Sequence, residues 1–115
     1  CTLIDGRDLD QWQRAVQPNT KVFFMETPTN PTLEVIDIAA VAEMAHKVGA
    51  RLIVDNVFAT PLWQSPLTLG ADVVVYSATK HIDGQGRCLG GVRVGCEGVG
   101  YLEWNGRRCG TMHTS

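Results

Sequence analysis

Three short apolar runs constrain the fold of this 115-residue chain more than any other feature. They read KVFFME (21–26), RLIVD (51–55) and DVVVYS (72–77). Each is short, rich in β-branched or aromatic residues and bounded by turn or polar residues, so each is predicted to be a strand. Nearly continuous apolar runs are typical of a largely parallel sheet covered by helices on both faces. We therefore expect these strands, the third included, to be buried.

Two segments beside these strands have the pattern of amphipathic helices. In residues 8–16, Asp8 is suited to cap the first turn, and Asp37 has the same place before residues 38–48. Gly49 suits the residue that follows a helix end. The predicted apolar faces consist of Leu9, Trp12 and Val16 in the first helix and of Ile38, Val41, Ala42, Ala45 and Val48 in the second.

The order of strand, helix and strand predicts an α/β domain over residues 1–95, with a mostly parallel sheet and flanking helices. The run GGVRVG (90–95) is a candidate fourth strand. The proline-containing segment 56–70 is expected to be a loop with one helical turn. Residues 96–115 show no helical or strand period, and we expect a linker-like or altered-frame tail there, the alternative being an ordinary surface segment.

Composition narrows the classes of function. Hydrophobic residues make up 44% of the chain and charged residues 19%, which is typical of a globular domain. The net charge of -2 and the absence of a basic stripe argue against a nucleic-acid partner. No apolar run is long enough to span a membrane, and no signal peptide is expected. The spacing of the four cysteines fits no metal site, so we expect reduced thiols, no metal and a cytoplasmic location; they are Cys1, Cys88, Cys96 and Cys109.

Polar side chains follow the three predicted strands, at the edge where an α/β sheet binds its ligands. Asn30 follows the first strand, Asp55 ends the second, and Ser77, Thr79 and Lys80 end or follow the third. Each alone is an ordinary cap, turn or surface residue. Together they supply an amine for a Schiff base, a carboxylate for a pyridine nitrogen, hydroxyls for a phosphate and an amide. The pattern predicts a site for an aldehyde cofactor.

Three motifs in this order resemble the Cys/Met-metabolism family of pyridoxal-phosphate enzymes, which includes cystathionine γ-synthase. They are ETPTNP (26–31), VDNVFATP (54–61) and YSATKHIDG (76–84). The resemblance implies pyridoxal 5'-phosphate as cofactor. It also implies the fold of the large cofactor domain of the aspartate-aminotransferase type (fold type I).

The resemblance also implies a role for each candidate residue. Lys80 matches the lysine that forms the imine with the cofactor and then moves protons between substrate carbons. Asp55 matches the partner of the pyridine nitrogen, and Ser77 and Thr79 match the phosphate-binding hydroxyls. Asn30 matches the asparagine near the cofactor's 3-oxygen and the substrate carboxylate. These residues are therefore the candidate catalytic and cofactor-binding set.

The run KHIDGQGRCLGG (80–91) most resembles the O-succinylhomoserine sulfhydrylase branch. That branch implies γ-replacement on an activated homoserine ester, a small amino-acid substrate and a homotetrameric parent enzyme. A lyase that carries out γ- or β-elimination is the alternative within the family. Val57 departs from the family pattern, which more often has threonine after the Asp-Asn pair.

Two interpretations of the sequence do not involve catalysis by this chain. Members of the family are several hundred residues long, so we expect this chain to match the middle quarter to third of one. A catalytically inactive fragment is therefore a competing interpretation. A nucleotide-binding α/β domain is disfavoured, because neither G-x-G-x-x-G nor a P-loop is present.

Overall fold

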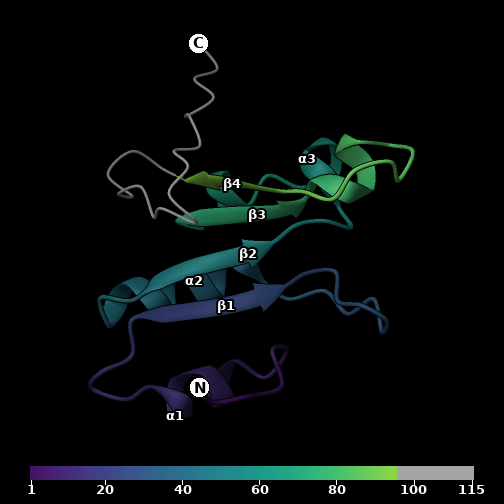
Figure 1. Ribbon diagram of the computed structural model, residues 1–115. Helices are drawn as coiled ribbons and strands as arrows, with labels where there is room; N and C mark the ends of the chain where they lie inside the picture. Colours follow the sequence, from purple (N-terminus) through teal and green to yellow (C-terminus); the bar gives the residue numbers. More distant parts are fainter. Residues whose placement is uncertain (96–115) are drawn as a thin grey trace.

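The computed structural model describes residues 1–95, which form a four-stranded sheet with helices packed beside it (Figure 1). The strand order is β1-β2-β3-β4. The elements in chain order are α1 (Leu9–Ala15), β1 (Val22–Glu26), α2 (Ile38–Lys47), β2 (Arg51–Asp55), α3 (Thr60–Trp63), η1 (Pro66–Leu69), β3 (Val73–Ser77), η2 (Ala78–Ile82) and β4 (Gly91–Gly95). Every predicted strand and helix is present, with ends within about two residues of the prediction. The predicted tail lies outside the described residues.

The sheet is mostly parallel. β1 pairs with β2 in register Phe23↔Leu52, and β2 pairs with β3 in register Val54↔Val74, both parallel. β4 is antiparallel to β3. It returns along β3 after a connection that contains only η2 and a loop, and no crossover helix precedes it as a parallel partner would require.

Local chemistry explains where the two longer helices begin and end. The Asp8 carboxylate accepts hydrogen bonds from the backbone N–H groups of Asp10 and Gln11 at 3.0 and 3.3 Å. The Asp37 carboxylate accepts one from the N–H of Ala40 at 3.0 Å. These bonds satisfy N–H groups that have no partner inside the helix. Gly49, after α2, has a φ of +70°, a conformation that glycine adopts without strain.

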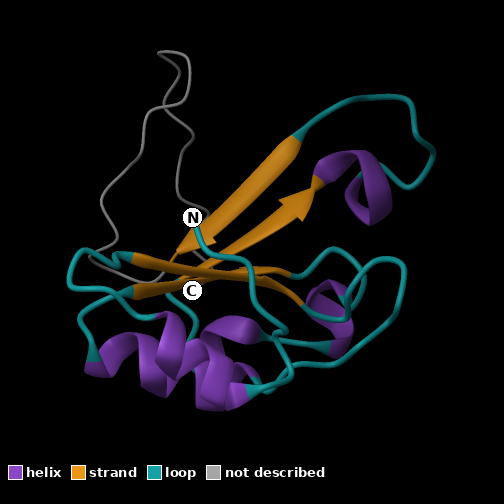
Figure 2. Ribbon diagram, turned by 90° about the horizontal axis from the view of Figure 1, so that it is seen from below, coloured by secondary structure: helices purple, strands orange, loops and turns teal. Residues whose placement is uncertain are grey.

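The hydrophobic core lies between α1, α2 and one face of the sheet. Trp12 of α1 stacks on Phe23 of β1 with ring centroids 5.2 Å apart, and its indole N–H donates to the Gly6 carbonyl at 2.9 Å. Figure 2 shows the longer helices gathered on this face, whereas a short helix lies beyond the far end of the strand pair β3–β4. The buried core residues are Trp12, Phe23, Met25, Ile36, Ile38, Val41, Ala42, Ala45, Ala50, Leu52, Val54, Ala71 and Val74.

The opposite face of the sheet carries no helix in the described part of the chain (Figure 2). Burial along β1 alternates, and the outward-facing Val22 and Phe24 are 50% and 59% exposed. The apolar runs therefore supply side chains to both faces, while the helices of residues 1–95 cover only one. The expectation of cover on both faces is not met within these residues.

Val48 is a correction to the predicted apolar face of α2. It is 44% exposed, although the helical period places it with Val41 and Ala45. The helix ends at Lys47, and Val48 is the C-cap with φ and ψ of −102° and 7°. Its side chain therefore leaves the direction of the helical face.

No helix of residues 1–95 is long and apolar enough to cross a bilayer.

Candidate functional site at the carboxyl ends of the strands

The carboxyl ends of β1, β2 and β3 meet at one edge of the sheet, as the sequence predicts for parallel neighbours. Glu26 is the register partner of Asp55, and Asp55 is the register partner of Val75. Beyond the strands, the N–H of Thr27 donates to the Asp55 carbonyl at 3.3 Å, and the N–H of Asn56 donates to the Val75 carbonyl at 3.1 Å. The loops that carry the candidate residues thus start side by side.

Asp55 lies half-buried on the sheet face that no described helix covers. Its Oδ1 accepts a hydrogen bond from the backbone N–H of Val57 at 3.0 Å. Because this contact comes from the backbone, it does not depend on the hydroxyl that valine lacks at position 57. The second carboxylate oxygen accepts no hydrogen bond from residues 1–95 and is available to a ligand.

Ser77 and Thr79 place two half-buried hydroxyls beyond Asp55. Ser77 shares a face with Val75 and therefore with Asp55, about 7 Å further along the strand direction at roughly 3.3 Å per residue. Thr79 Oγ1 accepts a hydrogen bond from the N–H of Gly90 at 3.1 Å. The hydroxyl hydrogen of Thr79 remains free to be donated to an anion.

Lys80 is exposed, which corrects the expectation that it directly follows a fully buried strand. Only Val73 and Val74 of β3 are buried, the remaining residues of the strand are half-buried, with Tyr76 packed against the core, and η2 follows at the end of the strand (Figure 2). Lys80 interrupts η2 with φ and ψ of −89° and −116°. Among residues 1–95, no carboxylate forms an ion pair with its amine.

Asn30 is exposed in the loop after β1. Its backbone N–H donates to Glu26 Oε2 at 3.2 Å. In the same loop, the backbone N–H of Thr29 donates a hydrogen bond to the Glu34 carbonyl at 3.0 Å, which stabilises the loop conformation. Within the described residues, no hydrogen bond or ion pair joins the side chains of the five candidate residues to one another. The structure therefore brings their strand ends together and leaves their functional groups without mutual contacts.

Asp83 holds the loop after Lys80, a role that the sequence reasoning missed. Its carboxylate accepts hydrogen bonds from the backbone N–H groups of Arg87 at 2.7 Å and Gln85 at 3.3 Å, and from the Cys88 thiol at 3.5 Å. These donors, the Arg87 N–H first among them, hold the pKa of Asp83 below its ordinary value. The signal in the sequence is an aspartate before Gly-x-Gly, typical of a turn closed by its own side chain.

A second missed feature is a buried polar cluster behind the strand ends. Thr27 and Asn56 are both 0% exposed, and Gln64 donates hydrogen bonds to each of these residues. An asparagine directly after a buried strand was the available signal.

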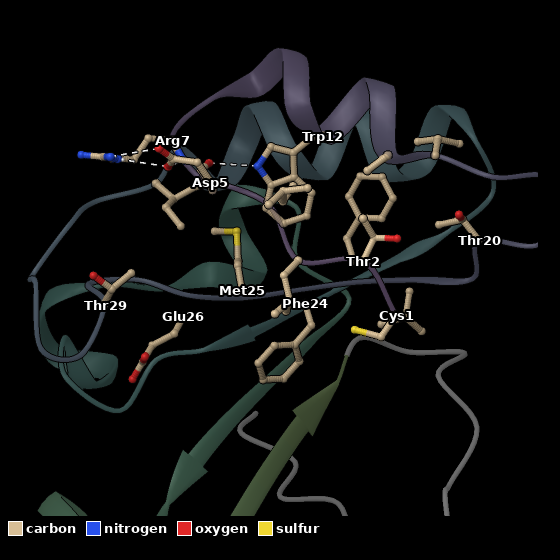
Figure 3. Close-up of a pocket in the computed structure, with 18 of the residues that line it drawn as sticks. Cys1, Thr2, Asp5, Arg7, Trp12, Thr20, Phe24, Met25, Glu26 and Thr29 are labelled. Atoms are coloured by element: carbon tan, nitrogen blue, oxygen red, sulfur yellow. Dashed lines mark hydrogen bonds and ion pairs between the residues drawn. The ribbon is translucent and has the colours of Figure 1, made fainter.

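A cavity of about 910 Å³ lies away from this site, between residues 1–7 and β1 (Figure 3). Trp12, Phe24 and Met25 contribute to the lining of the cavity. Glu26, the last residue of β1, lines the cavity at the end nearest to the candidate site. β1 pairs only with β2 among the described strands, so the cavity runs beside its unpaired edge. None of the five candidate residues lines it.

An ion-pair cluster lies at this cavity. Arg7 pairs with Asp5 at 2.9 Å and with Glu34 at 2.8 Å. The Arg7 guanidinium lowers the pKa of Asp5 through a side-chain hydrogen bond. The charges of this cluster are mutually paired, so they do not point to a bound ligand.

The profile of the family described as "Cys/Met metabolism PLP-dependent enzyme" matches residues 1–113. The chain is 60% identical over 92 residues to the O-succinylhomoserine sulfhydrylase of Mycobacterium tuberculosis, covering 80% of this chain and 23% of that protein. It is 58% identical over 104 residues to the enzyme of the same name from Pseudomonas aeruginosa, covering 86% and 26%.

A solved structure shares the fold. The crystal structure of cystathionine γ-lyase from Lactobacillus plantarum, complexed with L-serine, superposes with a TM-score of 0.80 at 44% identity. The superposition covers 82% of this chain and 25% of that one. The chain thus spans about a quarter of the length of the relatives it matches.

Proposed function

The chain belongs to the Cys/Met metabolism family of pyridoxal-phosphate-dependent enzymes, and we propose that it carries the cofactor-binding strand ends of a γ-replacement enzyme. The substrate class is an activated homoserine ester such as O-succinylhomoserine, with a sulfide or thiol as the incoming group. The identity of 58–60% to two proteins named O-succinylhomoserine sulfhydrylase carries this proposal. The lyase structure is less similar, at 44% identity.

The donor set at the strand ends fits pyridoxal 5'-phosphate. Asp55 has a carboxylate oxygen free to face the pyridine nitrogen, and Lys80 has an exposed amine to bond the aldehyde carbon. The hydroxyls of Ser77 and Thr79 would hold the phosphate, with Thr79 donating the hydrogen that its contact with Gly90 leaves free. We assign the Asn30 amide to the ring oxygen and the substrate carboxylate.

The mechanism follows from these roles. When bound, pyridoxal phosphate withdraws electrons from the attached amino acid, so that protons can leave its carbon atoms. The Asp55 carboxylate keeps a proton on the pyridine nitrogen by providing a negative charge beside it. The Lys80 amine, released when the substrate's own amino group takes its place on the cofactor, would reach on its flexible four-carbon stem to take the proton from Cα and to move protons at the next carbon. The Cγ–O bond would then break, the γ-acyloxy group would leave as a carboxylate, and the sulfur of the thiol would bond to Cγ as its proton is lost.

Elimination is the second candidate function. The similarity to a cystathionine γ-lyase structure, with a TM-score of 0.80, supports it. The products distinguish the two reactions. Both reactions release succinate from O-succinylhomoserine, but replacement with sulfide yields homocysteine, whereas γ-elimination yields a 2-oxo acid and ammonia.

A catalytically inactive chain is the third candidate. Its support is the span of about a quarter of the relatives' length. Such a chain would bind the cofactor without turning over either substrate.

The proposal extends to partners and location. We infer a small amino-acid substrate, a homotetrameric parent enzyme in the cytoplasm, and no nucleic-acid or membrane partner. The family match supports the amino-acid substrate, and the weak net charge of -2 agrees with the absence of a nucleic-acid partner.

The test is an absorption spectrum of the purified chain mixed with pyridoxal phosphate, followed by borohydride reduction and mass mapping. We expect a band at about 410–430 nm and an adduct on Lys80. Diffuse labelling that includes Lys21 and Lys47, without a defined band, would overturn the proposal. Product analysis with O-succinylhomoserine and sulfide then separates replacement, elimination and inactivity.

A further inference from the structure

Two buried polar residues stand directly behind the candidate site. Thr27 is the first residue after β1, and Asn56 is the first residue after β2; both are 0% exposed. Burial of a polar group lowers the stability of the fold unless the group is hydrogen-bonded. The hydrogen-bond partners of Thr27 and Asn56 are therefore expected to matter for the structure here.

The side chain of Gln64 joins the two strand ends. Its Nε2 donates to the carbonyl oxygen of Thr27 at 2.9 Å and to Oδ1 of Asn56 at 2.7 Å. Gln64 lies just after α3, where its N–H donates to the Thr60 carbonyl at 3.2 Å. One side-chain amide therefore fixes the end of β1 against the end of β2, from a position 37 residues beyond Thr27.

Asn56 extends the cluster to the third strand. Its Nδ2 lies 3.1 Å from the hydroxyl of Tyr76, 2.9 Å from the Gln64 carbonyl and 3.2 Å from the Thr60 carbonyl, and its two hydrogens are shared among these oxygens. The ring of Tyr76 meets the ring of His81 edge-on, with centroids 5.5 Å apart. The cluster thus reaches the segment that presents Lys80.

The amide side chain of Gln64 matches this arrangement of acceptors without placing a charge there. Both contacts of Gln64 Nε2 are to oxygen acceptors, so the position requires two N–H donors on one atom. A glutamate would direct a carboxylate at two acceptors, and a methionine of similar shape would leave them without a donor. The members of the cluster are neighbours of functional residues, because Asn56 adjoins Asp55 and Tyr76 adjoins Ser77.

We propose that Gln64 is a positioning residue that sets Asp55 relative to Ser77 and Lys80 without touching cofactor or substrate. The inference rests on the proposed function for its meaning, since those residues are assigned to the cofactor there. Its structural content is independent: loss of the Gln64 amide should loosen the three strand ends together, while α1 and α2 stay as they are.

The first test needs no cofactor. Amide hydrogen exchange is measured in the chain and in Gln64→Met, with Gln13→Met on the exposed side of α1 as the matched control. The N–H groups of Thr27 and Asn56 should exchange at least about two- to tenfold faster in Gln64→Met, the factor expected for loss of either one of the two hydrogen bonds that Gln64 Nε2 donates. Equal exchange in the two variants would overturn the inference.

If Gln64→Met does not fold, the conservative variant Gln64→Glu is measured instead, at acidic pH, where the neutral carboxylic acid can donate one hydrogen bond. Exchange at Thr27 and Asn56 no faster than in the control would then overturn the inference.

The second test uses pyridoxal phosphate. In Gln64→Met, we expect the apparent Kd for the cofactor to rise about tenfold and the visible band to shift in wavelength or in its pH midpoint. Gln13→Met should match the unsubstituted chain. A purely structural role would lower the melting temperature and leave the band of the folded protein unchanged, which would overturn the positioning role.

The two proposals fail in different ways. A Lys80 adduct in the unsubstituted chain, with an unchanged band and Kd in Gln64→Met, overturns the inference alone. No Lys80 adduct in the unsubstituted chain overturns the proposed function, and with it the role of Gln64 toward the cofactor.

Discussion

Glu26 and Asp55 are direct register partners at the carboxyl ends of β1 and β2, with their side chains on the same face of the sheet. Glu26 Oε2 accepts a hydrogen bond from the backbone N–H of Asn30 at 3.2 Å, and Asp55 Oδ1 accepts one from the backbone N–H of Val57 at 3.0 Å, so each carboxylate has one oxygen that accepts no hydrogen bond from residues 1–95. Two acidic side chains in one row favour a cationic group above them. Under the proposed function, we assign the pyridinium to Asp55 rather than Glu26, because Asp55 ends β2, which pairs with the strand that carries Ser77, whereas Glu26 ends β1, which does not pair with that strand among the described residues.

Replacement of Asp55 should separate cofactor attachment from turnover. In Asp55→Ala, we expect the borohydride-trapped adduct on Lys80 to persist while any γ-replacement activity falls by about 100-fold or more, comparable to loss of a positioned acid or base. Product formation from O-succinylhomoserine and sulfide is the measurement, and Asp10→Ala on exposed α1 is the control. Near-normal turnover in Asp55→Ala would remove Asp55 from its assigned role.

Replacement of Lys80 should abolish the trapped adduct. Lys80→Ala removes the amine that would bond to the cofactor at the end of β3, so the visible band should disappear. Lys47→Ala is the matched control, because Lys47 lies on α2 in an ion pair with Glu43 at 2.6 Å. Mass mapping after borohydride reduction decides the outcome, and an adduct of equal yield in Lys80→Ala would mean that another lysine is used.

The loop after Lys80 should loosen at acidic pH. Hydrogen bonds, first from the Arg87 N–H, hold the folded-state pKa of Asp83 below its ordinary value of 3.8. A depressed carboxylate pKa contributes stability above the unfolded pKa, and that contribution is lost as the pH falls through the folded pKa. An NMR titration of the Arg87 amide should therefore show a midpoint below 3.8 that disappears in Asp83→Asn. A midpoint at or above the ordinary value contradicts this account.

Truncation of the core should cost far more than truncation of the surface. Leu52 is 0% exposed in the centre of the sheet, and Leu62 is 88% exposed on α3. Leu52→Ala should lower the free energy of unfolding by about 2–5 kcal/mol, because buried methyl groups are lost and a cavity remains. Leu62→Ala should change it by less than about 0.5 kcal/mol. Urea unfolding measures both, and similar midpoints would show that β2 is not the centre of the core.

Much of the local structure was predictable because it depends on neighbours in the chain. Asp8 and Asp37 cap helices through N–H groups two or three residues away, and Gly49 ends α2 through its own backbone freedom. The apolar runs specify strands regardless of which strand lies beside them. For the same reason, the kinds of functional group at the strand ends were readable, since Asp55 and Ser77 each terminate a run.

The features that only the tertiary structure decided depend on contacts between residues far apart in the sequence. The antiparallel direction of β4, the cover on one face of the sheet and the exposure of Lys80 follow from which elements pack together. The hydrogen bond from Gln64 to the Thr27 carbonyl cannot be predicted from the residues near either position in the sequence. A sequence specifies donors, acceptors and apolar surface residue by residue, whereas burial and long-range hydrogen bonds are properties of the assembled packing.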